Sequence, residues 1–339
     1  MKVPKKDKIL GLGLVSGGLD SLIASLILKL QDIEVVGLNF KSPFCICDKA
    51  YKNSQCGLNL YYEKLGIKIV TQQKQDDYIE LIRNPKYGHG RNLNPCIDCR
   101  IYIIKKAKEY GEKIKADFIF TGEVLNQRPK SQNLTALKII EEESGLQDKL
   151  LRPLSARLLK PTIFEEEGLV DRSKLLAIKG RSRKVQLELA KKYDILDEYY
   201  ACGGCLLTDM SFSNRMRDYL KYTKYPKMKD IIFLKIGRHF RYNNSKIIVG
   251  RDEIENRTLI QIKKPEDWIM EATEIVGPIT IIQGKIDDKV LEFAAKITLR
   301  YSDFKGKVGS VIYRNNLESL NRHIIVEKEK SEVFEPYNL

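Results

Sequence analysis

A glycine-rich hexapeptide, Ser16-Gly-Gly-Leu-Asp-Ser21, separates an apolar run from an amphipathic pattern near the start of the chain. The apolar run, Ile9 to Val15, predicts a buried strand, and apolar residues recur at helical spacing from Leu19 to Leu30. Glycines at positions 17 and 18 allow a sharp turn, and the start of the helix presents backbone N–H groups and its positive dipole end. Strand, tight loop and helix in this order predict a phosphate-binding loop.

Two other nucleotide-binding motifs do not fit this segment. Gly13 and Gly18 have Walker A spacing, but Leu19 stands where that motif requires lysine. Gly11-x-Gly13 lacks the third glycine of the dinucleotide-binding fingerprint. The remaining structural alternative is a glycine-rich turn before a helix, without a ligand.

Strand and helix patterns alternate along the first two thirds of the chain. Further strands are expected at Glu34–Phe40, Ile67–Val70 and Asp117–Phe120, and helices near Leu58–Leu65 and after Pro95. Such alternation predicts an α/β fold, a parallel sheet with flanking helices. Residues 124–179 look like an insertion over the carboxyl edge of the sheet, and Val185, Leu189 and Tyr193 mark one face of a closing helix.

The pattern changes near residues 222–230, where lysine, tyrosine and proline cluster. Beyond it, short β-type runs are expected at Ile231–Ile236, Lys246–Val249 and Thr280–Gln283. We therefore expect two domains, residues 1–225 and a smaller α+β domain of residues 226–339.

Composition bears on location and partners. The 339 residues are 43% hydrophobic, without an 18-residue apolar run, and the start lacks a signal-peptide pattern, so we expect a cytoplasmic protein without a membrane partner. The net charge is +14, with 39 basic and 28 acidic residues up to Tyr225 and 20 and 17 from Pro226 onward. A polyanion such as RNA is one partner that fits this surplus, and a generally lysine-rich proteome is the alternative explanation.

The hexapeptide resembles the PP-loop of the ATP pyrophosphatase superfamily, whose members split ATP between the α and β phosphates and adenylate a carbonyl oxygen. The resemblance implies that Ser16, Gly17, Gly18 and Ser21 cradle pyrophosphate, that Asp20 helps hold Mg²⁺, and that Leu19, Asn39 and Gly122 belong to the same ATP site.

Seven cysteines, an odd number, argue against a disulfide framework and for metal, cluster or redox use. Two CxxC pairs stand out, Cys96-x-x-Cys99 at an expected helix start and Cys202-x-x-Cys205. By spacing alone, a structural zinc site is the commonest explanation. Three interpretations are open for the remaining cysteines, Cys45, Cys47 and Cys56: a second metal site, a persulfide relay or simple loop thiols.

The cysteine segments resemble those of tRNA thiouridylases. Asn94-Pro-Cys96-x-x-Cys99 and Gly203-Gly-Cys205 are similar to elements of the tRNA 2-thiouridylases, whereas Thr121-Gly-Glu-Val-Leu-Asn-Gln127 is closer to the tRNA 4-thiouridine synthetase. The resemblance covers roughly residues 9–207 and implies a tRNA sulfurtransferase that adenylates a uridine carbonyl oxygen and replaces it with sulfur, at C2 or C4.

The same resemblance implies particular roles for the cysteines. A [4Fe-4S] cluster would be held by Cys96, Cys99 and Cys205, with Cys202 as an alternative ligand, and one iron would stay open to sulfide. A persulfide mechanism and a structural zinc site remain the alternatives. Asp20, Cys99 and Cys205 are the expected catalytic residues, and the expected partners are tRNA and a sulfur donor, either sulfide or a persulfide carrier. The sequence leaves the oligomeric state open, with a homodimer as one option.

Two segments are candidates for RNA contact. Arg181, Arg183 and Lys184 stand at a helix start, where they either bind phosphate or form a solvated helix end. In the C-terminal part, Arg238 and Arg251 lie among β-type runs and aromatic residues. The stretch Val249-Gly-Arg-x-x-x-x-Asn256 resembles the RNA-binding domain of the NFACT family, and a β-hairpin with a solvated face is the alternative.

Two rival functions remain at this stage. One is an ATP-dependent PP-loop synthetase or amide ligase that acts on a small molecule and has a structural zinc site. The other is a non-enzymatic RNA-binding adaptor with a vestigial loop, against which the complete hexapeptide from Ser16 to Ser21 argues.

Overall fold

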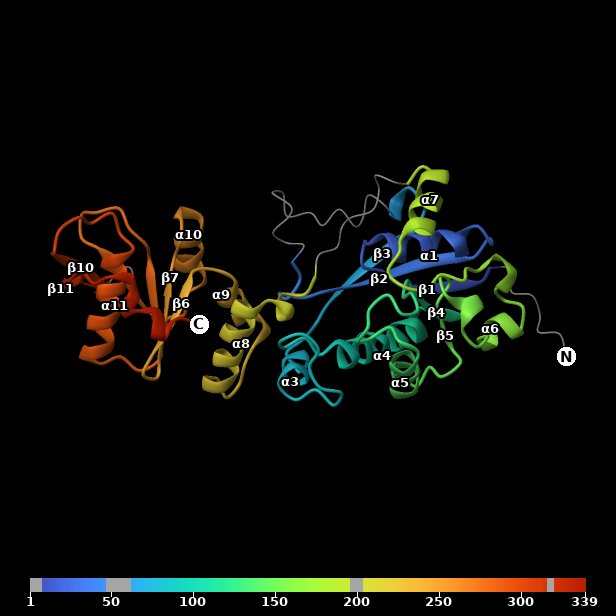
Figure 1. The fold of residues 1–339 in the computed structure, drawn as a ribbon, viewed down its shortest axis with the longest axis horizontal. Helices are drawn as coiled ribbons and strands as arrows, with labels where there is room; N and C mark the ends of the chain where they lie inside the picture. Colours follow the sequence, from blue (N-terminus) through green and yellow to red (C-terminus); the bar gives the residue numbers. More distant parts are fainter. Residues whose placement is uncertain (1–7, 47–61, 196–203, 316–319) are drawn as a thin grey trace. The chain divides into compact units, whose positions relative to one another are not determined.

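The computed structural model describes residues 8–46, 62–195, 204–315 and 320–339. The chain forms two compact units, unit 1 from Met1 to Thr208 and unit 2 from Asp209 to Leu339 (Figure 1). This division lies earlier than the boundary expected after residue 225. The reason is that helix α8 (Met210–Tyr222) packs within unit 2, where Arg215 Nη1 donates to the Leu234 carbonyl at 2.8 Å and Tyr219 Oη to Asp230 at 3.1 Å.

Unit 1 contains a five-stranded parallel sheet with the order β3-β2-β1-β4-β5. The strands are β1 (Leu10–Leu14), β2 (Glu34–Lys41), β3 (Lys68–Gln73), β4 (Phe118–Thr121) and β5 (Leu150–Leu151). From the central strand β1 the chain continues to β2 on one side, and β4 pairs with β1 on the other. Ligands of open parallel sheets bind at such a switch point, outside the carboxyl ends of the strands.

Helices cover both faces of this sheet (Figure 1). The helices of unit 1 are α1 (Leu19–Lys29), α3 (Asp77–Arg83), α4 (Cys96–Ile114), α5 (Leu134–Ser144), α6 (Ile163–Glu166) and α7 (Lys184–Lys192). On one face α1 and α7 share a core with Val35 and Phe120, and on the other α4 and α5 pack on Leu12 and Leu38. The expected α/β class is thereby confirmed.

Some local expectations differ from the structure. Residues 124–179 are more than an insertion, because they supply α5 and the strand β5 that extends the sheet beyond β4. In α7 the buried residues are Gln186 and Ala190, while Val185 is 42% exposed. Leu189 and Tyr193 do pack against the core as the apolar spacing predicts, but the fully buried positions beside them are Gln186 and Ala190. Most of the helix expected at 58–65 lies outside the described residues.

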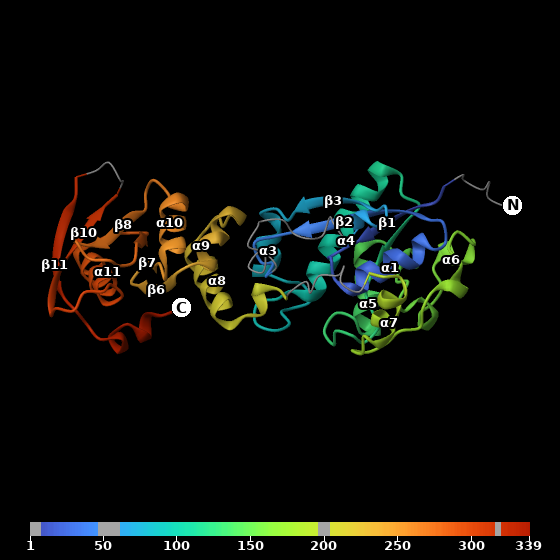
Figure 2. The same cartoon turned by 90° about the horizontal axis from the view of Figure 1, so that it is seen from above.

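Unit 2 is built on a six-stranded antiparallel sheet with the order β11-β10-β8-β9-β7-β6, and Figure 2 shows β11 at its edge. The strands are β6 (Arg238–Tyr242), β7 (Ser245–Val249), β8 (Trp268–Ala272), β9 (Thr280–Gln283), β10 (Val308–Arg314) and β11 (Arg322–Glu327). Alternate residues of β7 face two cores, because Ile247 packs with α11 (Asp288–Arg300) and Ile248 with α9 (Ile231–Lys235) and α10 (Glu253–Ile262). The expected smaller α+β domain is confirmed as an architecture.

The run expected as a strand at 231–236 is the helix α9. Ile231, Phe233 and Leu234 are buried, and a short apolar run of this kind does not distinguish a strand from a buried helix by periodicity. Within the ranges that the structure describes, no helix is both long and apolar enough to span a bilayer.

Candidate active site

The glycine-rich loop follows β1 and leads into α1, as its sequence predicts. Gly17 has a φ of 81°, a conformation that suits glycine. The Ser21 hydroxyl donates to the Gly18 carbonyl at 2.8 Å and lies 3.1 Å from the Tyr62 hydroxyl, which ties the loop to the first turn of α1. Leu19 is buried in the core beneath the loop.

Gly122 lets the end of β4 approach the loop closely. A Cβ atom at this position would lie 2.6 Å from the backbone nitrogen and Cα of Ser21. The expected place of Gly122 beside the loop therefore has a steric basis. Asn39 is also nearby, since its side-chain amide donates to the Val15 carbonyl at 2.8 Å.

Two glutamine side chains hold the carboxylate of Asp20. Gln127 Nε2 donates to one oxygen at 3.1 Å, and Gln186 Nε2, from α7, donates to the other at 3.0 Å. Gln186 is fully buried, so its amide position is fixed by packing. A single carboxylate with fixed oxygens suits Mg²⁺, which is typically bound by one or two carboxylates together with substrate phosphates.

A cavity of about 450 Å³ opens over the loop at the carboxyl ends of the strands. Its walls include the loop residues Ser16, Gly18, Leu19, Asp20 and Ser21, together with Asn39 and Gly122. The same cavity is lined by four cysteines, Cys45, Cys96, Cys99 and Cys205. Residues far apart in the sequence therefore bring the thiols and the glycine-rich loop to one cavity.

The cysteines come from three places in unit 1. Cys96 begins α4 and Cys99 lies in its first turn, while Cys45 and Cys205 pair in an isolated antiparallel bridge. All four are free thiols. Cys47, Cys56 and Cys202 lie outside the described residues.

The pKa values of Cys96, Cys99 and Cys205 are shifted in different directions. Burial alone would raise the pKa of Cys99, but Lys74, a hydrogen bond from Tyr78 and Arg100 outweigh it, so that pKa lies below its ordinary value. Lys74 Nζ donates to Cys99 Sγ at 3.2 Å. Burial raises the pKa of Cys205 to about 12, and burial together with Cys99 raises the pKa of Cys96. Of these three thiols, Cys99 is the one whose pKa favours the thiolate.

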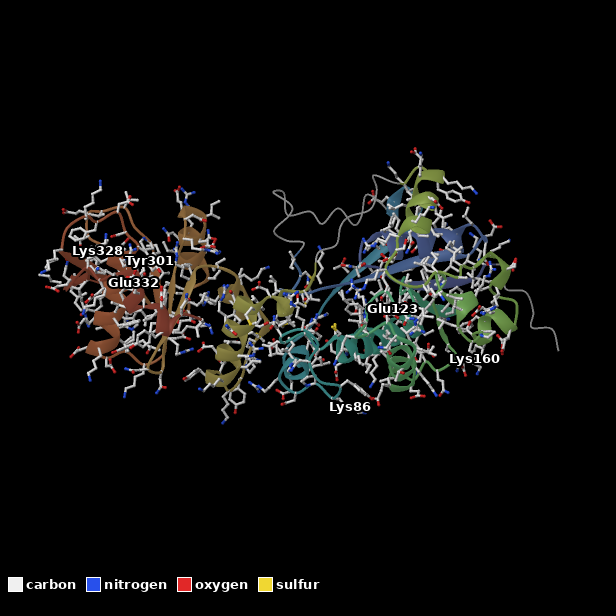
Figure 3. The ribbon with its side chains drawn as sticks, in the orientation of Figure 1. Lys86, Glu123, Lys160, Tyr301, Lys328 and Glu332 are labelled. Atoms are coloured by element: carbon white, nitrogen blue, oxygen red, sulfur yellow. The ribbon has the colours of Figure 1, made fainter. Side chains whose placement is uncertain are left out.

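A buried charged cluster supports the wall between β4 and α4. Glu123, inside unit 1 (Figure 3), accepts a hydrogen bond from Arg152 Nε at 3.1 Å, and Arg100 Nε lies 3.4 Å from its other oxygen. Burial would raise the pKa of Glu123, but Arg100 and Arg152 lower it below its ordinary value. Arg100 and Arg128 line the cavity, so this wall presents cations to an anionic ligand.

The thiols of the cavity can be compared with what a [4Fe-4S] cluster or a zinc ion, the two groups that the sequence implies, would require. In the ranges that the structure describes, no three His, Cys, Asp or Glu side chains are grouped so as to hold a metal ion. Thiolates on a four-iron cluster bind different irons and do not converge on one point, and thiols are the donors that such a cluster takes. Cys96, Cys99 and Cys205 on one cavity therefore fit a cluster in their chemistry. The four-cysteine zinc alternative includes Cys202, outside the described residues.

The expected RNA-contact residues of unit 1 lie at the surface. Arg181, Arg183 and Lys184 are exposed, and Arg183 also lines the cavity. The basic segment therefore reaches the cavity wall at Arg183, and α7, which begins at Lys184, also carries Gln186.

In unit 2, Arg238 and Arg251 make internal contacts. Arg238 lies over the ring of Tyr301 at 4.5 Å, and Arg251 Nε donates to Glu255 at 3.0 Å with 43% of its side chain exposed. The spacing of glycine and asparagine in Val249-Gly-Arg-x-x-x-x-Asn256 also has a structural reason. Asn256 Oδ1 accepts a hydrogen bond from Ile279 N at 2.9 Å. A Cβ atom at Gly250 would lie 2.1 Å from the same oxygen.

Several site residues escaped sequence reasoning. Lys74, Tyr78 and Gln186 carry no local motif, and their roles depend on contacts across the fold. Two other residues could have been found from the sequence, because Arg100 is next to Cys99 and Gln127 ends the segment Thr121–Gln127 that resembles the tRNA 4-thiouridine synthetase.

Family models match both ends of the chain. One described as "Thiamine biosynthesis protein (ThiI)" matches residues 7–163, and one described as "NFACT protein RNA binding domain" matches residues 237–338. A solved 4-thiouridine synthetase–RNA complex with bound ATP has 18% identity and a TM-score of 0.33, covering 56% of this chain and 52% of that one. That structural likeness is too low to bear on the fold.

Curated relatives are tRNA-specific 2-thiouridylases named MnmA. The one from Pseudomonas fluorescens (strain Pf0-1) is 28% identical over 248 residues, which are 69% of this chain and 61% of that protein. The one from Listeria monocytogenes serotype 4a (strain HCC23) is 23% identical over 318 residues, 86% of this chain and 81% of that protein. The chain spans about 60% of the length of the relatives from Pseudomonas fluorescens. These matches agree with the resemblance drawn from the sequence: the chain is similar to tRNA thiouridylases over much of its length, and its C-terminal region is similar to the NFACT RNA-binding domain.

Proposed function

We propose that this protein is an ATP-dependent tRNA sulfurtransferase. The observation that carries the proposal is the single cavity in which the phosphate loop and the thiols of Cys96, Cys99 and Cys205 meet. A small-molecule ligase needs the loop but not several thiols beside it. The names of the curated relatives support tRNA as the substrate.

In the proposed reaction, a uridine carbonyl oxygen attacks the α phosphate of ATP and pyrophosphate leaves. The loop from Ser16 to Ser21 binds the phosphates, and Asp20, held by the two glutamines, binds Mg²⁺. Nucleophilic sulfur then attacks the activated carbon, and AMP departs with the former carbonyl oxygen. Adenylation is required because a carbonyl oxygen is itself a poor leaving group.

The finer proposal concerns the sulfur-bearing group. Cys96, Cys99 and Cys205 would hold a [4Fe-4S] cluster, which when bound would offer one iron without a protein ligand to sulfide. Lys74 would balance negative charge beside Cys99, and the neighbouring Arg100 would do the same. A persulfide on a cysteine and a zinc site are the alternatives, and C2 and C4 are both open as the modified position.

The main test is the nucleoside content of tRNA. Mass spectrometry of tRNA from a deletion strain should show the loss of one thiouridine, and the purified protein should restore it with ATP and a sulfide source while releasing AMP and pyrophosphate. Asp20→Ala should abolish both the formation of thiouridine and the release of AMP and pyrophosphate, while the protein keeps its fold. Unchanged thiouridines in the deletion strain would refute the proposal.

The cluster is tested on protein purified without oxygen. It should contain iron and inorganic sulfide, and Cys96→Ala, Cys99→Ala and Cys205→Ala should each lose both. Cys202→Ala separates the alternatives, because a four-cysteine zinc site requires it and a three-thiolate cluster does not. Zinc in the wild type that is lost in Cys202→Ala would overturn the cluster assignment.

A further inference from the structure

A second hollow lies on unit 1, between α4 and the carboxyl end of β3. We refer to this hollow, of about 310 Å³, as the α4–β3 groove. Three aromatic residues line it, Phe40, Tyr102 and Tyr110. Its other lining side chains are three glutamines, two lysines and a glutamate, and none is aliphatic. The groove therefore combines ring surfaces with hydrogen-bonding and charged groups.

The groove residues of α4 alternate between rings and ammonium groups. Tyr102, Lys106, Tyr110 and Lys113 are spaced by four, four and three residues, so they share one face of the helix. Tyr102 is fixed there, since its hydroxyl donates to Asp77 at 2.9 Å and its ring packs edge-on against another tyrosine. Lys106 lies 3.4 Å from Glu109 in an exposed pair, which contributes little stability and can yield to a phosphate.

Gln72 and Gln73, at the end of β3, and Gln75, just beyond it, also line the groove, and Gln75 Nε2 donates to the Gln73 carbonyl at 3.1 Å. A glutamine amide offers both a donor and an acceptor, which is what the edge of a nucleobase requires. Tyrosine rings provide stacking surfaces, and lysines provide partners for phosphate. This combination suits a nucleotide better than an apolar protein segment.

The location relates the groove to the reaction cavity. Phe40, at the end of β2, lines both hollows. β3 is the edge strand next to β2 in the order of the sheet, as Figure 2 shows. A polynucleotide with one residue in the cavity could therefore place a neighbouring residue in the groove.

We propose that the α4–β3 groove binds a nucleotide of the substrate RNA that neighbours the uridine in the reaction cavity. The inference rests on the proposed function. The base stacks on the tyrosines of α4 and meets the glutamine amides, and Lys106 and Lys113 contact its phosphates. RNA is favoured over ATP because the phosphate loop already takes the phosphates of ATP, whereas the groove has two lysines of its own.

The test compares two variants of the full chain that lose equal charge. Lys106→Ala/Lys113→Ala removes both groove lysines, and Lys105→Ala/Lys138→Ala removes two exposed lysines that do not line the groove. The probe is unfractionated tRNA from the deletion strain, with affinity measured from low to moderate salt. Loss of two contacts should reduce the slope of log affinity against log salt by about 1.4 in the groove variant. The control should keep more of the wild-type slope.

A third variant tests stacking separately from charge. Tyr110→Leu keeps apolar contact with the core and removes the ring, so RNA affinity should fall roughly 5- to 150-fold with an unchanged salt slope. Equal affinity and slope in the groove and control variants would overturn the inference. So would a raised KM for ATP with unchanged RNA affinity, because the groove would then hold adenine. Absence of thiolation by the wild type would overturn the proposed function, while RNA affinity would still report on the groove.

Discussion

At the scale of single residues, the absence of a Cβ atom at Gly122 lets the end of β4 lie against the glycine-rich loop. We expect Gly122→Ala to abolish ATP binding, because its Cβ would lie 2.6 Å from the backbone of Ser21 and push the loop out of position. Equilibrium binding of ATP measures the loss. Gly111→Ala, in α4, is the control, since its nearest neighbour is a side-chain carbon at 3.4 Å and alanine favours a helix. Wild-type ATP affinity in Gly122→Ala would contradict the steric argument.

Gln186 provides a second prediction at this scale. Gln186→Met keeps the size of the buried side chain but removes the donor to Asp20. A hydrogen bond to a charged group contributes about 1.5–3 kcal/mol, so kcat/KM for ATP should fall roughly 10- to 100-fold. Rates of RNA-dependent pyrophosphate release measure the effect. Lys191→Ala, exposed on the same helix, should leave the rate unchanged. Equal rates for both variants would show that Gln127 suffices to hold the carboxylate.

At the scale of secondary-structure elements, α7 joins an exposed basic segment to a buried contact with the phosphate loop. Replacing Arg181, Arg183 and Lys184 together with alanine should lower the salt slope of tRNA binding by roughly 2, since up to three phosphate contacts would be lost. A double variant, Arg181→Ala/Lys184→Ala, should keep an ATP affinity near the wild-type value without RNA, because it retains Arg183 in the cavity wall and the contact from Gln186 to Asp20. An unchanged slope would place the RNA contacts of unit 1 elsewhere.

At the scale of the whole molecule, the single tryptophan, Trp268 in β8, reports on the unfolding of unit 2. Lys246 is buried there, 3.5 Å from Asp218, which also accepts from Arg241 at 2.8 Å. Burial lowers the pKa of Lys246 to about 8, although Asp218 opposes the shift. At pH 7 the buried charge therefore costs stability, and Asp218 would keep Arg241 if the lysine were removed.

Lys246→Met should accordingly raise the unfolding free energy of unit 2 by about 1–2 kcal/mol at pH 7. The advantage should shrink as pH rises from about 8 towards the ordinary lysine pKa of 10.5, because the folded wild type then loses the proton while the unfolded chain keeps it. Denaturant titrations followed by tryptophan fluorescence measure the difference. An advantage that stays constant over this pH range would contradict the assigned cause.

The sequence by itself determined the parts of this protein that depend on neighbours along the chain. The hexapeptide at 16–21 specifies a turn between a strand and a helix through glycine conformation and helical periodicity, and alternation of the two patterns specifies the parallel sheet. The CxxC pairs and the NFACT-like motif could also be recognised in the sequence, because each is defined by the spacing of residues that are close along the chain. An apolar run as short as α9 was ambiguous, because its length and periodicity suit a strand as well as a helix.

Tertiary structure decided which distant side chains share the cavity. Lys74 reaches Cys99 and Gln186 reaches Asp20 only after the strands are ordered and α7 has packed on α1. These contacts join residues as far as 166 positions apart, and no local pattern encodes them. The contrast between Cys99 and Cys205 arises in the same way, since burial and neighbouring charge shift their pKa values in opposite directions. Burial and neighbouring charge are properties of the folded environment, and the residue type alone does not determine them.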